Sequence, residues 1–367
     1  MKHVDRMLVF GFVRAWLICF VSLVSLYIII DLFNKLDDFL DISRDGGLPV
    51  LLLQVGQHYG CQLTLIFDRL CGMMLLLAGM FTLTWLQRNN ELTPLLAAGV
   101  SMRRLLRPVW AVTLIFVLVS VVNREWVMPS LAASLQTSPR DLRGDRALFV
   151  IGSYEPNGLL VEGKLAHRQD KLIEGFMVTA PEQIAGTLVV LQAREARYIP
   201  PGTGPETGGW LLTEAHPPIL APWPVPVLTM IDPGKFFLKT ELVDFEMLTR
   251  SKAWHQFASL QDLKEEMNRP GARFLPLIAM QIHLRTTAPA LMLIVVVMGL
   301  GMVLANRDRH FFINAGLCLA LAALFYGVQL GAKYLGENEY VAPALAAWLP
   351  LLTFGPLALV LQDAVPT

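Results

Sequence analysis

Six long apolar stretches constrain the fold of this chain more than any other feature of its sequence. They cover residues 7–33, 66–86, 105–122, 276–305, 311–335 and 341–361. A helix needs about 20 largely apolar residues to cross the hydrocarbon core of a membrane. Charged residues make up only 16% of the chain, whereas soluble domains carry about 25%. We therefore predict an α-helical membrane protein with six transmembrane helices.

The six stretches form two groups of three, and a polar region separates the groups. We divide the chain into residues 1–123 with the first three helices, residues 124–270 outside the membrane, and residues 271–367 with the last three helices. Short cytoplasmic loops are enriched in Lys and Arg. One side of the membrane receives Lys2, Arg6, Arg88, Arg103, Arg104, Arg107, Arg307 and Arg309, and the other receives Lys35, Arg44, Arg69 and Lys333. Both termini are therefore predicted to be cytoplasmic, with the central region on the opposite side.

The central region changes character from helical to β patterning. Short segments rich in β-branched residues lie at residues 147–155, 158–168, 171–180, 187–199, 209–216 and 225–231, with Gly- and Pro-rich turns between them. Many short strands at even spacing are typical of a sandwich or jelly roll. We predict an inserted extracytoplasmic all-β domain of jelly-roll type. Ser259 and Asp262 then form a capping-box pattern for a helix that returns the chain to the membrane.

One segment resembles a nucleotide-binding motif without completing it. Residues 158–165, GLLVEGKL, nearly match the phosphate-binding pattern G-x-x-x-x-G-K-[ST], but Leu165 stands where a magnesium-binding hydroxyl is needed. The segment also lies among strand signals, so we interpret it as a β-hairpin. We expect this chain to bind no cofactor. If ATP drives the protein, another chain must bind it.

Other function classes find little support in the sequence. The formal net charge is zero, which gives no overall attraction to nucleic acid. No Cys/His cluster has metal-ligand spacing, and no catalytic pair of carboxylates or nucleophile motif is present. Acidic residues deep in the apolar stretches would mark a proton pathway, and these are nearly absent. Asp68 and Arg69, at the outer end of the second stretch, are interpreted as a local ion pair.

Two cationic residues are candidates for contact with an anionic lipid. Lys35 follows the first stretch near the headgroup level of the outer leaflet, which suits a lipid phosphate; the alternative is a solvated loop of mixed charge. Arg285 lies with His283 inside the fourth stretch, about two turns below the outer face. It either contacts a lipid phosphate or extends outward to the membrane surface. Gly327 and Gly331 form a GxxxG pattern, a candidate helix-packing face.

Residues 88–103 predict a short helix at the cytoplasmic surface. Glu91 lies where it favours a helix N-terminus, and Leu92, Leu95 and Leu96 form an apolar stripe. Gly99 marks a break, Ser101 is placed to cap the next helix, and Arg104 marks the membrane surface. Such a helix is suited to dock into a groove on a soluble partner. A plain interfacial amphipathic helix is the alternative.

This segment carries a family resemblance. Glu91-Leu92-Thr93-Pro94-Leu95-Leu96-Ala97-Ala98-Gly99-Val100-Ser101, with Arg104 and Pro108, resembles the pattern that follows the second helix in the LptF/LptG permeases of lipopolysaccharide export. Residues 341–350, VAPALAAWLP, resemble the pattern at the start of the sixth helix in that family. Pro94 departs from the small residue that is usual there, and the surroundings of Asp68 and Arg69 depart from the usual Pro-containing entry.

The resemblance implies a specific set of partners. It places this chain in the bacterial inner membrane as one permease subunit of an ABC transporter that extracts lipopolysaccharide or a related glycolipid. A cytoplasmic ATPase dimer is expected to dock on Glu91, Leu92, Leu95, Leu96, Gly99, Ser101 and Arg104. A second permease of the family, or a second copy, would pack beside helices one and five, near Gly327 and Gly331. The β domain would pass the lipid to a periplasmic bridge protein.

Three rival functions follow from the same architecture. A secondary lipid or solute carrier would be favoured by intramembrane carboxylates and internal repeats. A membrane-anchored sensor or assembly factor would use the β domain to bind a protein, without an ATPase. A membrane enzyme would need a catalytic constellation.

Overall fold

The structure is a computed structural model that describes residues 2–132, 147–202, 207–220, 222–251, 253–268, 275–305 and 311–363. The chain divides into two compact units. The helical unit comprises Met1–Leu135, His255–Leu263 and Pro276–Thr367, and the β unit comprises Gln136–Trp254 and Lys264–Leu275. Residues 124–135 and 255–263 therefore belong with the helices, although the sequence places them in the extramembrane region. Arg307, Arg309 and Arg269 lie outside the described residues.

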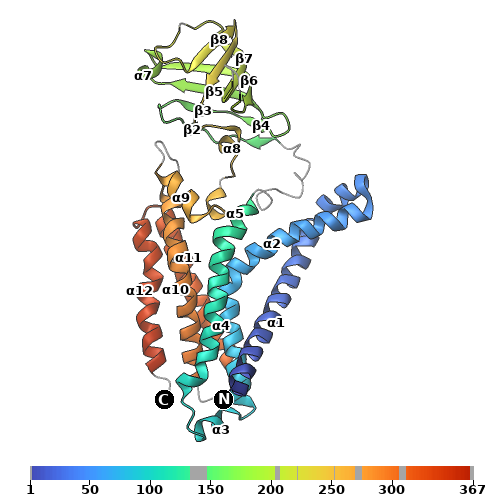
Figure 1. The fold of residues 1–367 in the computed structure, drawn as a ribbon, viewed down its shortest axis with the longest axis vertical. Coiled ribbons are helices and arrows are strands. Elements are labelled where there is room, and N and C mark those ends of the chain that lie inside the picture. Colours follow the sequence, from blue (N-terminus) through green and yellow to red (C-terminus); the bar gives the residue numbers. More distant parts are fainter. Residues whose placement is uncertain are drawn as a thin grey trace. The chain divides into compact units, whose positions relative to one another are not determined.

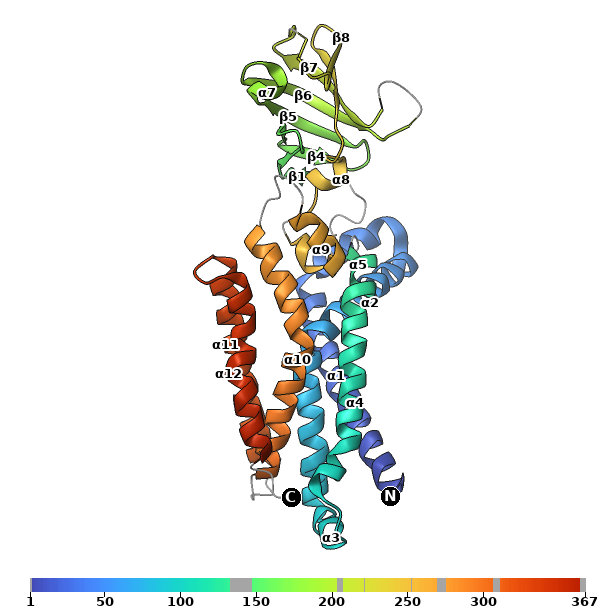
Figure 2. The ribbon, with the colours of Figure 1, turned by 60° about the vertical axis from the view of Figure 1, so that its left-hand side comes forward.

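Within the described residues, six helices of the helical unit are long and apolar enough to cross a membrane. They are α1 (Lys2–Asn34), α2 (Leu36–Arg88), α4 (Met102–Val122), α10 (Leu275–Ala305), α11 (Phe311–Glu337) and α12 (Pro343–Asp363). The beginning of α1, the short helix α3 (Leu92–Ala97) and the end of α12 lie at one end of the helical unit (Figures 1 and 2). The prediction of three helices before and three after an inserted region is confirmed.

Helix α2 is much longer than the predicted apolar stretch. It covers 53 residues and is interrupted at Gly47, whose φ of 73° no other residue type adopts easily. Only Val55–Arg88 qualifies as a membrane span. The alternative reading of a solvated loop after the first helix is therefore wrong, because the chain continues as helix from Leu36.

Helix α4 also extends beyond its predicted end. It continues through a π-helical turn, η1 (Asn123–Val127), into α5 (Met128–Ser130). A π-helical turn inserts one residue into an α-helix and is frequent at functional sites. The charged residues Arg124 and Glu125 consequently lie on the membrane helix instead of in the extramembrane region.

The core of the helical unit is built around α2. Met74, Leu75 and Leu76 of this helix are fully buried, and they pack in one cluster with side chains of α1, α4, α10 and α11. Close approach between α2 and α10 depends on glycine. A Cβ atom on Gly299 would collide with the side chain of Leu76. Small residues let helices approach closely where lipid offers no hydrophobic driving force between them.

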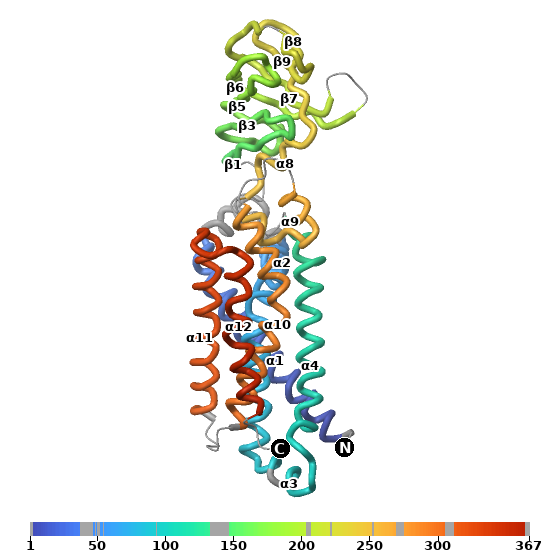
Figure 3. The backbone as a smooth tube through the Cα atoms, turned by 90° about the vertical axis from the view of Figure 1, so that its left-hand side faces the viewer, coloured from blue at the N-terminus to red at the C-terminus, as the bar shows by residue number. Residues whose placement is uncertain are grey.

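The β unit contains one antiparallel sheet. Its strands, within the described residues, are β1 (Leu148–Phe149), β2 (Ser153–Tyr154), β3 (Leu160–Glu162), β4 (Leu165–His167), β5 (Leu172–Ala180), β6 (Val189–Ile199), β7 (Gly209–His216), β8 (Leu228–Asp232) and β9 (Lys235–Lys239). The order is β1-β4-β5-β6-β7-β9-β8, and β3 pairs with β2 and β5. Figure 3 shows these strands curling around a common interior. The inserted antiparallel β region is confirmed; β9 is a strand that the sequence reading missed.

The segment that resembles a phosphate-binding loop is one interrupted strand. β3 and β4 do not pair with each other, so the predicted hairpin is wrong. Both pair with β5 in a single register, in which Glu162 faces Met177 and Leu165 faces Glu174. Gly163 and Lys164 interrupt the strand, and the Lys164 N–H still donates to the carbonyl of Glu174. Strand pairing of this kind leaves no loop that could surround a phosphate.

The interior of the β unit is fixed by buried aromatic and polar contacts. Trp210 is fully buried, and its indole N–H donates to the Val243 carbonyl at 3.0 Å. The buried carboxylate of Glu155 accepts the N–H of Leu242 at 3.1 Å and that of Val243 at 2.7 Å. A buried charge needs such hydrogen bonds to offset the loss of water. These contacts hold the segment after β9 against the sheet.

The predicted capping box is confirmed at the start of α9 (Leu260–Met267). The Asp262 N–H donates to Oγ of Ser259 at 3.1 Å, and the Ser259 N–H donates to Oδ2 of Asp262 at 2.9 Å. This reciprocal pair satisfies two backbone donors that have no partner inside the helix. Residues 255–263, which we call the connector, contain the 3₁₀ turn that ends at Gln256, the capping box and the first turn of α9.

Candidate functional site

The predicted docking segment contains a helix of only six residues. Asn90, with a φ of 56°, lies in the turn between α2 and α3, and Gly99, with a φ of 79°, separates α3 from α4. Glu91 takes the N-cap position of α3, is half-buried, and makes no capping bond with its side chain. Helix α3 itself lies at one end of the helical unit (Figure 1).

The predicted apolar stripe on this segment divides between two environments. Leu92 and Leu95 pack against the core of the helical unit. Leu96, by contrast, is 41% exposed. Leu95 and Leu96 point about 100° apart around the helix axis, so Leu96 can face outward while Leu92 and Leu95 contact the bundle. Leu96 is thus the leucine available to a partner.

The C-terminal part of the docking segment differs from the prediction in one detail. Ser101 takes the N-cap position of α4, but its hydroxyl makes no capping bond. Its backbone carbonyl instead accepts the N–H of Arg104 at 3.0 Å. Gly99, Ser101 and Arg104 are all exposed, so the turn between α3 and α4 is accessible to a partner.

Lys35, the N-cap residue of α2, forms an ion pair with Asp31 of α1. Its ammonium lies 3.0 Å from Oδ2 of Asp31, one turn earlier. The Tyr59 hydroxyl of α2 donates to the same oxygen at 3.2 Å. Both members of the ion pair are partly exposed. Lys35 therefore lies at the junction of α1 and α2 with its charge already balanced, and an anionic ligand would compete with Asp31 for it.

Arg285 lies inside the helical unit with its charge paired. Its side chain is only 2% exposed, and Nη1 lies 3.2 Å from Oε1 of Glu125. Nη2 donates to the Gln256 carbonyl at 3.1 Å. The guanidinium therefore reaches partners within the chain, and both contact with a lipid phosphate and outward extension to the membrane surface stay predictions. The Nε–H group is buried and has no hydrogen-bond partner among the described residues.

Asp68 also has a different partner from the one predicted. It binds Arg124 of η1 in a two-pronged ion pair, with Nε at 2.9 Å from Oδ1 and Nη2 at 3.1 Å from Oδ2. Arg69 is exposed. Residues i and i+1 of a helix point in directions about 100° apart, so Asp68 and Arg69 cannot both face the bundle. The local pair predicted from the sequence is wrong.

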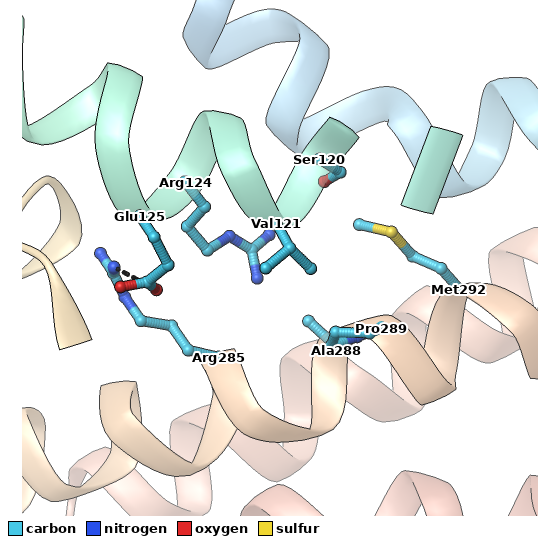
Figure 4. A pocket seen from close by; sticks show the side chains of 8 residues that line it. All are labelled: Ser120, Val121, Arg124, Glu125, Arg285, Ala288, Pro289 and Met292. Carbon is cyan, nitrogen blue, oxygen red and sulfur yellow. Dashed lines mark hydrogen bonds and ion pairs between the residues drawn. The ribbon is translucent and has the colours of Figure 1, made fainter. Parts of the chain in front are cut away.

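Members of both ion pairs line a small hollow between α4 and α10 (Figure 4). Its water-accessible volume is about 20 Å³, and Arg124, Glu125 and Arg285 are its charged lining residues. The remaining lining residues are Ser120, Val121, Ala288, Pro289 and Met292. The sequence reading missed Arg124 and Glu125 because it ended the third helix at residue 122. A helical pattern continued to Pro129 would have found them.

The glycine pair of α11 faces away from the described part of the chain. A Cβ atom added to Gly327 or Gly331 would meet no atom of the described residues within 4 Å. Leu324 and Leu330 on the same helix are exposed. The face is therefore open, as a surface for packing against another helix must be. His283 is half-buried, and its carbonyl accepts the Thr287 hydroxyl.

Together these features define a class: a six-span membrane protein with an inserted antiparallel β unit and a short exposed helix between its second and third spans. No group of three or more His, Cys, Asp or Glu side chains is arranged to hold a metal in the part of the chain that the structure describes.

The chain belongs to the LptF/LptG family, because the model of the lipopolysaccharide export system permease LptF/LptG matches residues 6–228 and 235–362. A comparison with curated proteins finds no match.

Membership of this family defines the function at a coarse level. The chain is a permease component for lipopolysaccharide export, and its six apolar helices make it a multi-pass inner-membrane protein. Permease components of this family are not enzymes. The membrane-enzyme reading is therefore set aside.

Proposed function

We propose that this chain is one permease subunit of an ABC transporter that extracts lipopolysaccharide, or a related glycolipid, from the outer leaflet of the inner membrane. A cytoplasmic ATPase dimer docks on the segment from Glu91 to Arg104 and hydrolyses ATP, while this chain binds no cofactor. The observation that carries the proposal is the short helix α3: Glu91, half-buried at its N-cap, makes no capping bond, and Leu96 is exposed. Its position at the same end as the beginning of α1 and the end of α12 fits a cytoplasmic location.

The remaining partners follow from the open surfaces. A second permease of the family, or a second copy of this chain, packs against α1 and α11, where Gly327 and Gly331 have no close neighbour among the described residues. Rocking of these two helices then admits the lipid. The β unit lies in the periplasm and hands the lipid to a bridge protein. Asp68 and Glu125 are carboxylates within the spans, but each is paired with Arg, which gives the carrier reading no support.

Native mass spectrometry of the tagged protein, gently extracted from its host, tests this assembly. We expect an ATPase dimer, a second permease and this chain in one complex. A monomer or homo-oligomer without an ATPase, under conditions that preserve other membrane complexes, would contradict the transporter proposal. That result would favour a carrier or a sensor.

Replacing Lys35 and Asp31 separately should change glycolipid retention in opposite directions. Lys35→Gln removes the proposed phosphate contact and should weaken retention. Asp31→Asn removes the competing carboxylate and should strengthen retention by about 1.4- to fivefold, because partly exposed ion pairs contribute about 0.2–1 kcal/mol. Co-purified lipid per protein, measured by mass spectrometry, reports both effects.

Lys333 provides the matched control for this pair of variants. It forms a similar one-turn ion pair with Glu337 at 3.6 Å and lies on the same predicted side of the membrane. Lys333→Gln should leave lipid retention unchanged. If Asp31→Asn instead weakened retention as much as Lys35→Gln, the pair would serve only to join the helices, and Lys35 would not be a lipid contact.

A further inference from the structure

Three consecutive side chains of the π-helical turn η1 connect the end of α4 to α2 and α10. Asn123 donates to the Thr64 carbonyl of α2 at 3.0 Å. Arg124 binds Asp68 of α2. Glu125 points in another direction, toward α10 (Figure 4), where it meets Arg285. Because a π turn changes the direction of successive side chains, this turn can serve α2 and α10 at once.

Glu125 closes a ring of polar contacts around the connector. Its Oε1 accepts Nη1 of Arg285 at 3.2 Å, and its Oε2 accepts the backbone N–H of Leu260 at 2.8 Å. Arg285 returns to the connector through the Gln256 carbonyl. The connector is thus held at two points, Gln256 and Leu260, by one ion pair between α4 and α10. All the members of this ring belong to the helical unit.

Fixing the connector through this ring carries a large desolvation cost. The Arg285 side chain is almost fully buried, and removing an ion pair from water costs several kcal/mol per ion. Buried ion pairs therefore add little net stability, and apolar residues of similar volume often serve as well. Their best-attested use is in specifying one arrangement among several. This argues for a pair that has two states.

The hollow beside the ring is small, with a water-accessible volume of about 20 Å³, about enough for one water molecule. Arg124, Glu125 and Arg285 all line it. The Nε–H group of Arg285 is buried without a hydrogen-bond partner among the described residues, so the guanidinium is not fully satisfied where it lies. This unmet donor favours a second arrangement of the pair.

We propose that the Glu125–Arg285 pair is a latch that holds the connector to α4 and α10 and opens once in each transport cycle. Glu125 is the positioning residue: it touches no lipid in this proposal but sets the connector through Arg285 and Leu260. The chain enters the β unit at both ends of the connector, so opening the latch frees a segment that the β unit follows on either side in the sequence. The proposal rests on the transport function proposed above.

A reducible cross-link between α4 and α10 tests whether the latch opens. Val121→Cys and Ala288→Cys line the hollow from the two helices and leave Glu125 and Arg285 intact. They are introduced after replacing Cys19, Cys61, Cys71 and Cys318, and joined by a short bis-methanethiosulfonate reagent. We expect the linked complex, reconstituted with its ATPase in vesicles containing lipopolysaccharide, to lose at least about nine-tenths of its ATP-dependent lipid release. Reduction should restore release.

Controls separate the latch from the proposed function itself. Each single-cysteine variant, treated with the same reagent, should keep full release. Full release by the linked protein would overturn the latch and leave the transporter proposal standing. An unlinked complex that never releases lipid on ATP addition would overturn the transporter proposal, and the latch with it.

Hydrogen exchange provides a second and independent measurement. If the latch opens during turnover, backbone amides of residues 255–263 should exchange faster with ATP present than without it, because Leu260 loses its acceptor. Amides at the centre of α2, near Leu75, serve as the internal control and should not change. Identical exchange of the connector with and without ATP during active release would overturn the latch.

Discussion

Replacing Glu91 with alanine is expected to abolish ATP-driven lipid release while leaving the protein folded. The Glu91 side chain takes the N-cap position of α3 without making a capping bond, so its loss costs the helix no capping interaction. A charge at a helix N-terminus contributes about 0.3–1 kcal/mol. In a docked interface, by contrast, truncating one member of a buried charge pair costs about 2–5 kcal/mol, which is at least about a 30-fold loss of affinity.

Three measurements check this prediction. Thermal unfolding of the Glu91→Ala variant should match the wild type within a few degrees, co-purification of the ATPase should fail, and lipid release should fall to background. Asp363 at the end of α12 provides a matched control, because it is exposed at the same end of the helical unit. Asp363→Ala should behave as wild type. Normal ATPase assembly and normal release in Glu91→Ala would contradict docking at this segment.

The two neighbouring leucines extend the same argument. Leu96 is exposed and Leu95 packs against the core. Leu96→Ala should therefore weaken ATPase docking without lowering stability, whereas Leu95→Ala should lower stability as well. Equal behaviour of the two variants would mean that α3 does not present a distinct face to the partner.

Apolar length was sufficient to predict the six helices, because in lipid a backbone of about 20 apolar residues has few alternatives to helix. Their ends were harder to predict. The helix α4 continues through Arg124 and Glu125, since these charges find partners on α2 and α10. Partners 56 and 160 residues away in sequence cannot be read from a local pattern. The sequence pattern therefore indicated that the third span ends before Arg124 and Glu125, although both residues are part of that helix.

The docking segment was predicted in place and composition but not in detail. Gly99 signalled the turn after α3 and does have a positive φ, whereas the turn at Asn90 before α3, also with a positive φ, was not predicted. The orientation of Leu92, Leu95 and Leu96 depends on how α3 rests on the bundle, which is a tertiary property. The β unit follows the same rule: alternation predicted most strands, but only the register with β5 shows that β3 and β4 are one broken strand.

Removing Arg285 alone is expected to destabilise the helical unit. Arg285→Met leaves the Glu125 carboxylate, which is 27% exposed, without its cation. Leaving such a group unpaired costs about 1–3 kcal/mol, which is less than the cost of about 3–5 kcal/mol for a fully buried charge. The double variant Glu125→Gln with Arg285→Met should recover most of that loss. It removes both charges, and the amide oxygen introduced at position 125 can still accept the Leu260 N–H. Unfolding of the purified protein by denaturing detergent measures both values.

Arg69 supplies the matched control for this comparison, because it is an exposed arginine of α2. Arg69→Met should change stability by no more than about 0.5 kcal/mol. A double variant as unstable as Arg285→Met would mean that the pair itself stabilises the fold, which contradicts the reasoning that led to a latch. A stable double variant that assembles with the ATPase but releases lipid poorly would separate the two properties. The ion pair would then be required for movement and not for folding.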